Sequence, residues 1–313
     1  MIVAENLCKS YGGHLAIDKV SFRIGAGEIV GLLGLNGAGK STILKILGSF
    51  LLPSAGRALV GGFSVDENPE AIRRLIGYLP DVPPLYDEMT VHSYLRYVAK
   101  LKNVPHGDVS HRVDFVMGKT NLNRVGKYQL GDLSHGFRQR VGIAQALVHN
   151  PKVIILDEPI NGLDPVQIVE MRDLITSLRG QHTVVLSSHI LSEITRTCDR
   201  VLVVDQGRLV AEGSEATLQA AMTQTMRLTC DLDRLPDGLI GSLQQVRGVA
   251  KVQRITGQGG ERLLLDTDAD VRAVIAKMVV EAGAGLLGLS RSEAGLEGVF
   301  MKLIKPAEER AHG

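Results

Sequence analysis

The feature that most constrains this chain is a glycine-rich stretch near its start, Gly34-Leu35-Asn36-Gly37-Ala38-Gly39-Lys40-Ser41-Thr42. It fits the phosphate-loop pattern, in which a glycine and four further residues precede Gly-Lys-Ser/Thr. The apolar run before it, residues 28–33, is typical of a buried parallel strand, and residues 41–47 have apolar side chains at helical spacing. The sequence therefore predicts a strand, a loop and a helix, which is the context that this pattern requires.

The residue types in this stretch suit the binding of a phosphate chain. Glycines adopt positive φ angles and let the backbone approach an anion closely. The N–H groups of such a loop form a concave nest at the positive end of a helix dipole. In this pattern the lysine, Lys40, reaches the β- and γ-phosphates and the hydroxyl of Ser41 ligates Mg²⁺. A nucleoside triphosphate with Mg²⁺ is the predicted ligand.

Composition excludes several other classes of protein. The net charge of the 313-residue chain is +1, which gives no general reason to expect nucleic acid as a partner. Cys8, Cys198 and Cys230 lie far apart, which argues against a disulfide framework or a cysteine-bound metal and suits a reducing compartment. The first residues have no basic segment typical of a signal peptide, and no apolar run approaches the length of a membrane span. We expect a soluble protein whose membrane role, if any, comes through a partner.

The pattern along the chain predicts two domains. Short β-branched runs at 153–156, 183–186 and 201–204 alternate with helical segments, as in a parallel α/β sheet, so we expect residues 1–215 to form one domain. Within it, residues from about 69 to 150 are predicted to be mainly helical. Residues 225–313 have the order β-α-β-β-α-β of a ferredoxin-like unit, with a hairpin at 257–260 and a last amphipathic helix at 296–304. For this second, α+β domain a packing, dimerisation or regulatory role is expected.

Two acids complete the predicted nucleotide site. Asp157 and Glu158 follow the apolar run at 153–156. A strand of this kind beside a phosphate loop places its terminal aspartate on Mg²⁺, directly or through water. The glutamate one residue later can polarise a water that is aligned with the γ-phosphorus, as a general base. The sequence thus predicts hydrolysis of the nucleotide in addition to binding.

Further motifs in this order make the chain resemble the ATP-binding-cassette family, the ATPase subunits of ABC transporters. Leu133-Ser134-His135-Gly136-Phe137 is similar to the family's signature motif, Asn161-Gly162-Leu163-Asp164 to its D-loop, and Ser188-His189 to its switch histidine. The resemblance covers about residues 1–215 and implies the mixed β core and helical subdomain of a P-loop NTPase. It also implies that Tyr11 stacks on adenine, that Glu158 and His189 are catalytic, and that Asp164 lies near the nucleotide.

The resemblance implies a second copy of the ATPase subunit. In this family two cassettes pair head to tail, so that Ser134, His135 and Gly136 of one chain contact the ATP held by the other. Two motifs depart from the family pattern: the signature has His135 and Phe137 where glycine and glutamine are commoner, and Asp81 stands where most members have glutamine. A carboxylate at Asp81 is a possible Mg²⁺ ligand. It is also a possible hinge residue that senses the partner.

The subclass and the partner follow from the same resemblance. Residues 77–91 and 296–303 are similar to ABC-2-type exporter ATPases, including the gliding-motility type. This implies a transmembrane permease on a separate chain, a homodimer of the ATPase, and a cytoplasmic location, peripheral on the inner face of the cell membrane. Two alternatives stay open: a soluble ABC ATPase that acts on ribosomes or DNA, and an ABC subunit that drives motility or pilus assembly instead of export.

Overall fold

The computed structural model describes residues 1–214, 216–218, 226–257 and 260–292. The chain divides into two compact units, Met1–Ser214 and Glu215–Gly313, and each contains its own hydrophobic cluster. We refer to them as the first and second units. Among the described helices, none has both the length and the apolar character needed to cross a lipid bilayer.

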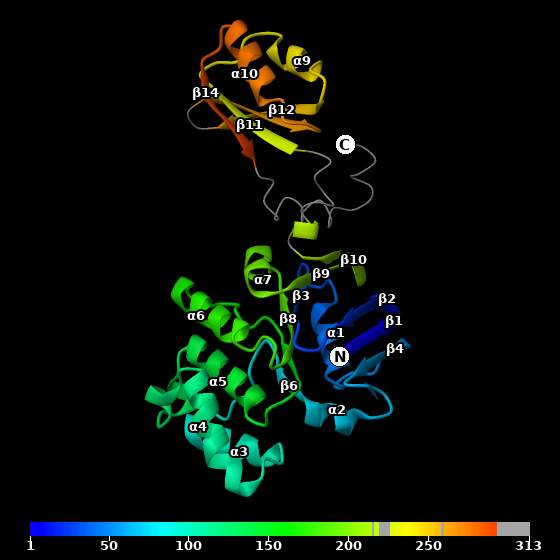
Figure 1. Ribbon diagram of the computed structural model, residues 1–313, viewed down its shortest axis with the longest axis vertical. Coiled ribbons are helices and arrows are strands. Elements are labelled where there is room, and N and C mark those ends of the chain that lie inside the picture. Colours follow the sequence, from blue (N-terminus) through cyan, green and yellow to red (C-terminus); the bar gives the residue numbers. More distant parts are fainter. Residues whose placement is uncertain (215, 219–225, 258–259, 293–313) are drawn as a thin grey trace. The chain divides into compact units, whose positions relative to one another are not determined.

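A six-stranded sheet with the order β10-β9-β3-β8-β7-β6 forms the centre of the first unit (Figure 1). Every pair of neighbours is parallel except β9 and β10. All residues of β3, β7 and β8 are buried, which explains the apolar runs at 29–33, 153–156 and 184–186. The strands span Ile29–Leu33 (β3), Ile76–Leu79 (β6), Val153–Leu156 (β7), Thr183–Ser188 (β8), Arg200–Asp205 (β9) and Arg208–Gly213 (β10).

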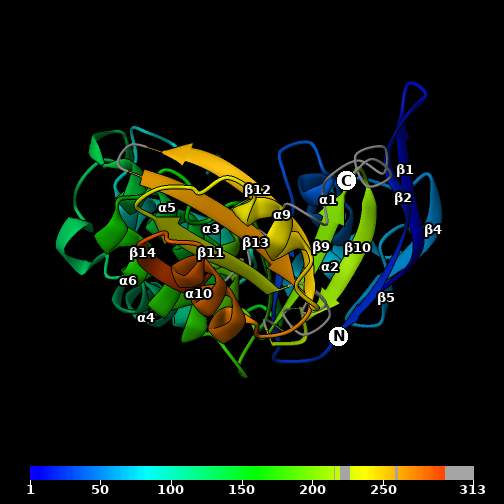
Figure 2. The same ribbon diagram turned by 90° about the horizontal axis from the view of Figure 1, so that it is seen from above.

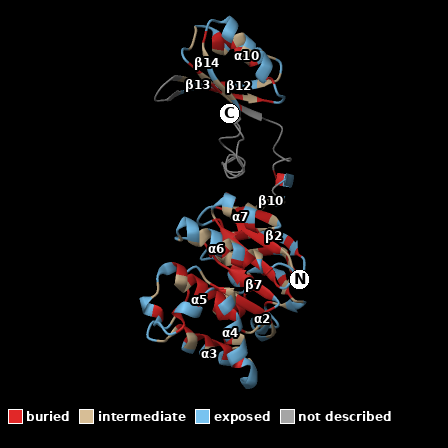
Figure 3. Cartoon of the chain, turned by 60° about the vertical axis from the view of Figure 1, so that its left-hand side comes forward, coloured by how far each residue is buried: buried red, intermediate tan, exposed pale blue. Residues whose placement is uncertain are grey.

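An antiparallel sheet with the order β2-β1-β4-β5 covers one side of this unit. Its strands are β1 (Ile2–Tyr11), β2 (His14–Ile24), β4 (Ala55–Val60) and β5 (Phe63–Ser64). Helix α1 (Lys40–Leu47) packs between the two sheets, because its apolar side chains share one buried cluster with side chains of both (Figure 1). In Figure 3 the buried residues, in red, fill the interior of the first unit around β7. Helix α7 (Leu191–Thr197) packs on β3, where a Cβ on Gly31 would lie 2.5 Å from Ile194 Cγ2. Packing against both sheets therefore fixes the position of α1, the helix that follows the glycine loop.

The segment predicted to be mainly helical contains one strand that the sequence analysis missed. After α2 (Pro69–Leu75), strand β6 pairs with β7 and joins the central sheet, so this part of residues 69–150 is not helical. The helical character predicted for this segment is seen in α3 (Val91–Leu101), whose N-cap Thr90 accepts a hydrogen bond from Ser93 N–H. The remaining helices are α4 (Val109–Lys119), α5 (His135–Leu147) and α6 (Pro165–Thr176).

The second unit has the element order β-α-β-β-α-β that the sequence analysis predicted. It consists of β11 (Met226–Leu232), α9 (Leu239–Gln244), β12 (Val249–Gly257), β13 (Gly260–Thr267), α10 (Arg272–Glu281) and β14 (Leu286–Ser292). The antiparallel sheet has the order β12-β13-β11-β14, with both helices on one face (Figure 2). Residues 258–259 of the expected hairpin and the expected helix at 296–304 lie outside the described residues.

Candidate active site

The candidate site lies at the carboxyl ends of the parallel strands β3, β7 and β8. Leu33 is in register with Ser188, and Leu156 is in register with Leu186, so the segments that follow these strands leave the sheet at the same edge. The glycine loop follows β3, the two acids follow β7, and His189 follows β8. This edge is where open α/β sheets bind their ligands.

The glycines of the loop are required by close backbone contacts. Gly37 and Gly39 have φ angles of 83° and 106°, a region that other residues rarely adopt. A Cβ on Gly39 would lie 2.8 Å from the carbonyl oxygen of Ala16, and one on Gly34 would lie 2.4 Å from that of Val204. The loop therefore packs directly against the neighbouring backbone at Gly34 and Gly39, which leaves no space for a side chain there, whereas Gly37 is favoured by its positive φ alone.

Lys40 is the central cation of the site. Its ammonium donates hydrogen bonds to the carbonyl oxygens of Gly34 at 2.8 Å and Leu35 at 3.3 Å. It also lies 3.2 Å from Glu158 Oε1, and only 6% and 12% of these two side chains are exposed. His189 Nδ1–H donates to the other carboxylate oxygen of Glu158 at 2.9 Å. The structure thus brings together the predicted lysine, the predicted general base and the predicted switch histidine.

A hydroxyl and a carboxylate in this site fit a magnesium ion. Ser41 Oγ donates to Asp157 Oδ1 at 3.1 Å, and Asp157 is buried with 3% of its surface exposed. Mg²⁺ prefers oxygen ligands and is commonly held by one or two carboxylates together with substrate phosphates. The donor set of Ser41 and Asp157 has this chemistry.

Ser187, in β8, is a site residue that the sequence analysis missed. Its Oγ donates to Asp157 Oδ1 at 2.7 Å and accepts from the backbone N–H of Glu158 at 2.8 Å. The side chain therefore holds both acids from the neighbouring strand. A possible sequence signal was a hydroxyl residue at the end of an otherwise apolar buried run, which requires a hydrogen-bond partner.

Lys40, Ser41, Glu158 and His189 line a cavity of about 360 Å³. Asp81, which follows β6, is part of its wall, and so are Ala16 and Asn161, which were not among the predicted ligands. The lining residues are Ala16, Leu35, Asn36, Gly37, Gly39, Lys40, Ser41, Thr42, Asp81, Glu158, Asn161 and His189. One pocket is thus lined by the glycine loop, Glu158 and His189, together with Asp81, which stands where most members of the family have glutamine.

Several predicted ligands do not line this cavity. Tyr11 ends β1 and is half exposed, with Lys9 Nζ 5.4 Å from its ring centroid. Asp164 caps α6, because its carboxylate accepts from Gln167 N–H at 2.9 Å. The signature residues Ser134, His135 and Gly136 form the N-terminal end of α5. Gly34 and Ala38 belong to the backbone frame of the loop, and Gly34 N–H donates to Ser188 O at 3.4 Å.

Two residues near the site, Tyr78 and Glu193, have raised pKa values. Burial raises the pKa of the Tyr78 hydroxyl, and the nearby Asp157 carboxylate raises it further. Burial also raises the pKa of Glu193, whose carboxylate accepts from Ser188 Oγ at 3.1 Å. In both groups the main cause is burial, which disfavours the charged form.

Comparisons with known proteins agree with this geometry. The family model described as ABC transporter matches residues 17–161. A bacitracin transport ATP-binding protein of Bacillus licheniformis is 32% identical over 314 residues, with 97% of each chain covered. A lantibiotic transport ATP-binding protein of Streptococcus pyogenes is 35% identical over 213 residues, covering 68% of this chain and 90% of that protein.

Solved structures show the same fold. The ATP-binding subunit of an ABC transporter matches with a TM-score of 0.65 and 30% identity, covering 71% of this chain and 92% of that one. A dimeric, post-hydrolysis ATP-binding cassette bound to ADP and Pi matches with a TM-score of 0.64 and 25% identity, covering 68% and 98%.

The chain belongs to the ABC transporter family, as an ATP-binding protein of that family. The predicted fold class, a P-loop ATPase of ABC type, is confirmed. The predicted activity, the binding and hydrolysis of ATP, agrees with the family and with the ATP-binding cassettes that it resembles.

Proposed function

We propose that this chain is the ATP-hydrolysing subunit of an exporter whose transmembrane permease is a separate chain. The observation that supports this most strongly is the meeting of Lys40, Glu158 and His189 in one cavity at the sheet edge. The nearly full-length similarity to proteins named for bacitracin transport supports export rather than import. Cargo selection then belongs to the permease.

Each side chain has a definite task in this proposal. Lys40 binds the β- and γ-phosphates, while the loop N–H groups bind the phosphate oxygens. Glu158 accepts the proton of the attacking water, and His189 holds the Glu158 carboxylate in line with the γ-phosphate. Ser41 and Asp157 hold Mg²⁺, which when bound neutralises charge that develops on the phosphates. Tyr11 stacks on adenine.

The signature motif supports the involvement of a second subunit. Ser134, His135 and Gly136 are absent from the residues that line the described cavity, which contains Lys40. In a head-to-tail pair, Ser134 and Gly136 at the N-terminal end of α5 would instead contact the ATP bound by the partner, with Asp164 at the same junction. The dimeric state of the related cassette supports a homodimer that closes on ATP.

The remaining assignments belong to the same proposal. Binding to the permease would place the ATPase on the cytoplasmic inner face of the cell membrane. Residues 1–215 act as the ATPase domain, and residues 225–313 act in dimerisation or regulation. The balanced net charge of +1 gives no support to a nucleic-acid partner.

Co-purification from native membranes tests the proposal. Tagged Glu158→Gln retains ATP, so it should be isolated in mild detergent with a polytopic membrane protein in stoichiometric amount, identified by mass spectrometry. Lys40→Ala, which loses the phosphate contact, serves as the matched control for ATP-dependent capture. Recovery of ribosomal or DNA-repair proteins without a membrane partner would overturn the transporter assignment.

Light scattering tests the pairing of subunits separately. With saturating Mg-ATP, Glu158→Gln should elute as a dimer, and Lys40→Ala should remain a monomer. A monomeric Glu158→Gln under these conditions would contradict ATP-driven pairing of the isolated subunit.

A further inference from the structure

Two side chains at the start of α5 bind the backbone of two residues in the wall of the nucleotide cavity. His135 Nε2 lies 3.0 Å from the carbonyl oxygen of Asn161. Gln139 Nε2 donates to the carbonyl oxygen of Asp81 at 3.3 Å. Both Asn161 and Asp81 line the cavity that contains Lys40. The helix that begins with the signature motif is therefore connected to its own chain's pocket at two points.

The first contact has a defined direction. A backbone carbonyl only accepts hydrogen bonds, so Nε2 of His135 carries the hydrogen whether the ring is neutral or charged. Asn161 N–H in turn donates to the carbonyl oxygen of Glu158 at 3.2 Å. Glu158 has a φ of 48°, so the turn that it begins has an unusual backbone conformation. His135 thus holds the far end of the turn that presents the general base.

His135 and Asn161 are exposed, and groups of the neighbouring segments lie close to their contact. A Cβ on Gly162 would lie 3.3 Å from His135 Nε2, and one on Gly136 would lie 2.4 Å from Gln167 Oε1. Gln167 N–H is bound by the carboxylate of Asp164, which caps α6. The first turn of α5 therefore contacts α6 through Gly136 and Gln167, and it contacts the segment before α6 through His135 and Gly162. A displacement of one would displace the other.

We propose that His135 is a positioning residue for the pocket of its own chain. It transmits the position of the neighbouring Ser134 to the turn between Glu158 and Asn161, so that hydrolysis in one pocket depends on how that chain's signature segment is placed. This rests on the proposed function, in which Ser134 contacts the partner's ATP. It differs from the role that the family resemblance implies for His135, which is contact with the partner's nucleotide. Glycine at this position has no side chain with which to form the bond.

Mixed subunits distinguish the two roles. A small amount of a test chain with intact Glu158 is combined with a tenfold excess of a Glu158→Gln partner, so that nearly all ATPase activity comes from the test chain's pocket. In the first mixture the test chain carries His135→Gly and the partner has His135. In the second mixture the test chain has no substitution, and the Glu158→Gln partner also carries His135→Gly. In the reference mixture the test chain has no substitution, and the partner carries only Glu158→Gln.

We expect kcat to fall about fivefold in the first mixture and to stay at the reference value in the second, because one hydrogen bond that orients the turn is lost in the active chain. The KM for ATP should change little. A loss confined to the second mixture, or no loss in either, would overturn the proposal. Ser134→Ala should give the opposite pattern, because its loss affects the partner's pocket.

Two further variants separate positioning from folding. His135→Gln keeps an N–H at the end of a side chain of similar reach and should restore most of kcat, with a pH–rate profile like that of the unsubstituted chain. His111→Asn, an exposed change on α4, should have no effect. If Glu158→Gln fails to dimerise, the pairing in the proposed function has failed, yet the loss of kcat should still follow the chain that carries His135→Gly.

Discussion

Lys40 Nζ lies 3.2 Å from Glu158 Oε1, so the cation that is proposed to bind the phosphates is paired with the acid that is proposed to activate water. Both side chains are almost entirely withdrawn from solvent, where the attraction between unit charges is much stronger than in bulk water. The γ-phosphate of ATP must therefore compete with Glu158 for Lys40. Binding and chemistry are coupled through this one pair.

Glu158→Gln should separate ATP binding from ATP hydrolysis. We expect kcat to fall by roughly 10²-fold or more, because the general base is lost. ATP should bind several-fold more tightly, because the neutral amide competes less for Lys40 and does not repel the phosphate. Single-turnover hydrolysis and equilibrium titration with a fluorescent ATP analogue measure the two effects. Weaker ATP binding would contradict this explanation, and the exposed Glu67→Gln is the control.

Ser187→Ala should impair catalysis although Ser187 does not line the cavity. The substitution removes the hydroxyl that binds both Asp157 Oδ1 and Glu158 N–H. We expect about a tenfold loss of kcat and a destabilisation of about 1–2 kcal/mol, since buried polar groups are left unsatisfied. Steady-state kinetics and urea unfolding test this. Ser177→Ala, which loses a hydroxyl at the end of α6, should retain full activity.

Asp81→Asn should show whether this carboxylate is a metal ligand. Asp81 is exposed and lines the cavity with Ser41. If it binds Mg²⁺, the Mg²⁺ concentration for half-maximal activity should rise several-fold while kcat at saturating Mg²⁺ changes little. The exposed Asp114→Asn on α4 is the control. An unchanged Mg²⁺ requirement would assign Asp81 to the hinge role instead.

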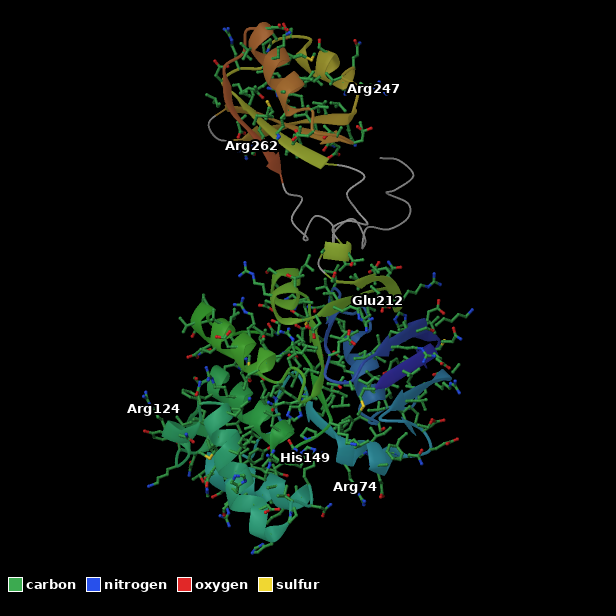
Figure 4. All side chains as sticks on the ribbon, viewed as in Figure 1. Arg74, Arg124, His149, Glu212, Arg247 and Arg262 are labelled. Carbon is green, nitrogen blue, oxygen red and sulfur yellow. The ribbon has the colours of Figure 1, made fainter. Side chains whose placement is uncertain are left out.

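The first unit should lose stability between about pH 6.5 and pH 4. His149, labelled in Figure 4, follows α5, and its Nε2–H donates to the Ile76 carbonyl at 2.9 Å. Burial and the nearby Lys102 lower the pKa of His149 to about 4 from 6.5. Between these values the unfolded chain binds a proton that the folded chain does not, so stability falls as the pH falls. The contribution is at most about 3 kcal/mol.

His149→Gln should flatten this dependence, because glutamine keeps a donor for Ile76 and does not titrate. Urea unfolding at pH 7.5 and pH 5, followed by tyrosine fluorescence, measures the change. All six tyrosines, which are Tyr11, Tyr78, Tyr86, Tyr94, Tyr97 and Tyr128, lie in the first unit, so the signal reports on that unit. An equal loss of stability in the variant would assign the effect to other groups, of which His182 is the first to examine, since burial also lowers its pKa.

The parts of the fold that could be predicted are those with a strong local pattern. Helix α3 has apolar side chains at helical spacing after the N-cap Thr90, and it lies in the segment that was predicted to be mainly helical. Strands β3, β7 and β8 are buried on both faces, and their apolar runs show this directly. Strand β6 was missed because it has only four residues and directly follows helix α2. Its pairing with β7 makes it a strand.

The sequence by itself determined the chemistry of the phosphate site, since the glycines, Lys40, Ser41, Asp157 and Glu158 follow two recognisable strands. Only the tertiary structure decided that Ser187 holds both acids, that Asp81 lines the cavity, and that His135 binds the Asn161 carbonyl. The physical reason is that residue type and local spacing encode what a side chain can do and which element it lies on. Which groups meet depends on strand order and helix packing, which bring together residues that are far apart in the chain.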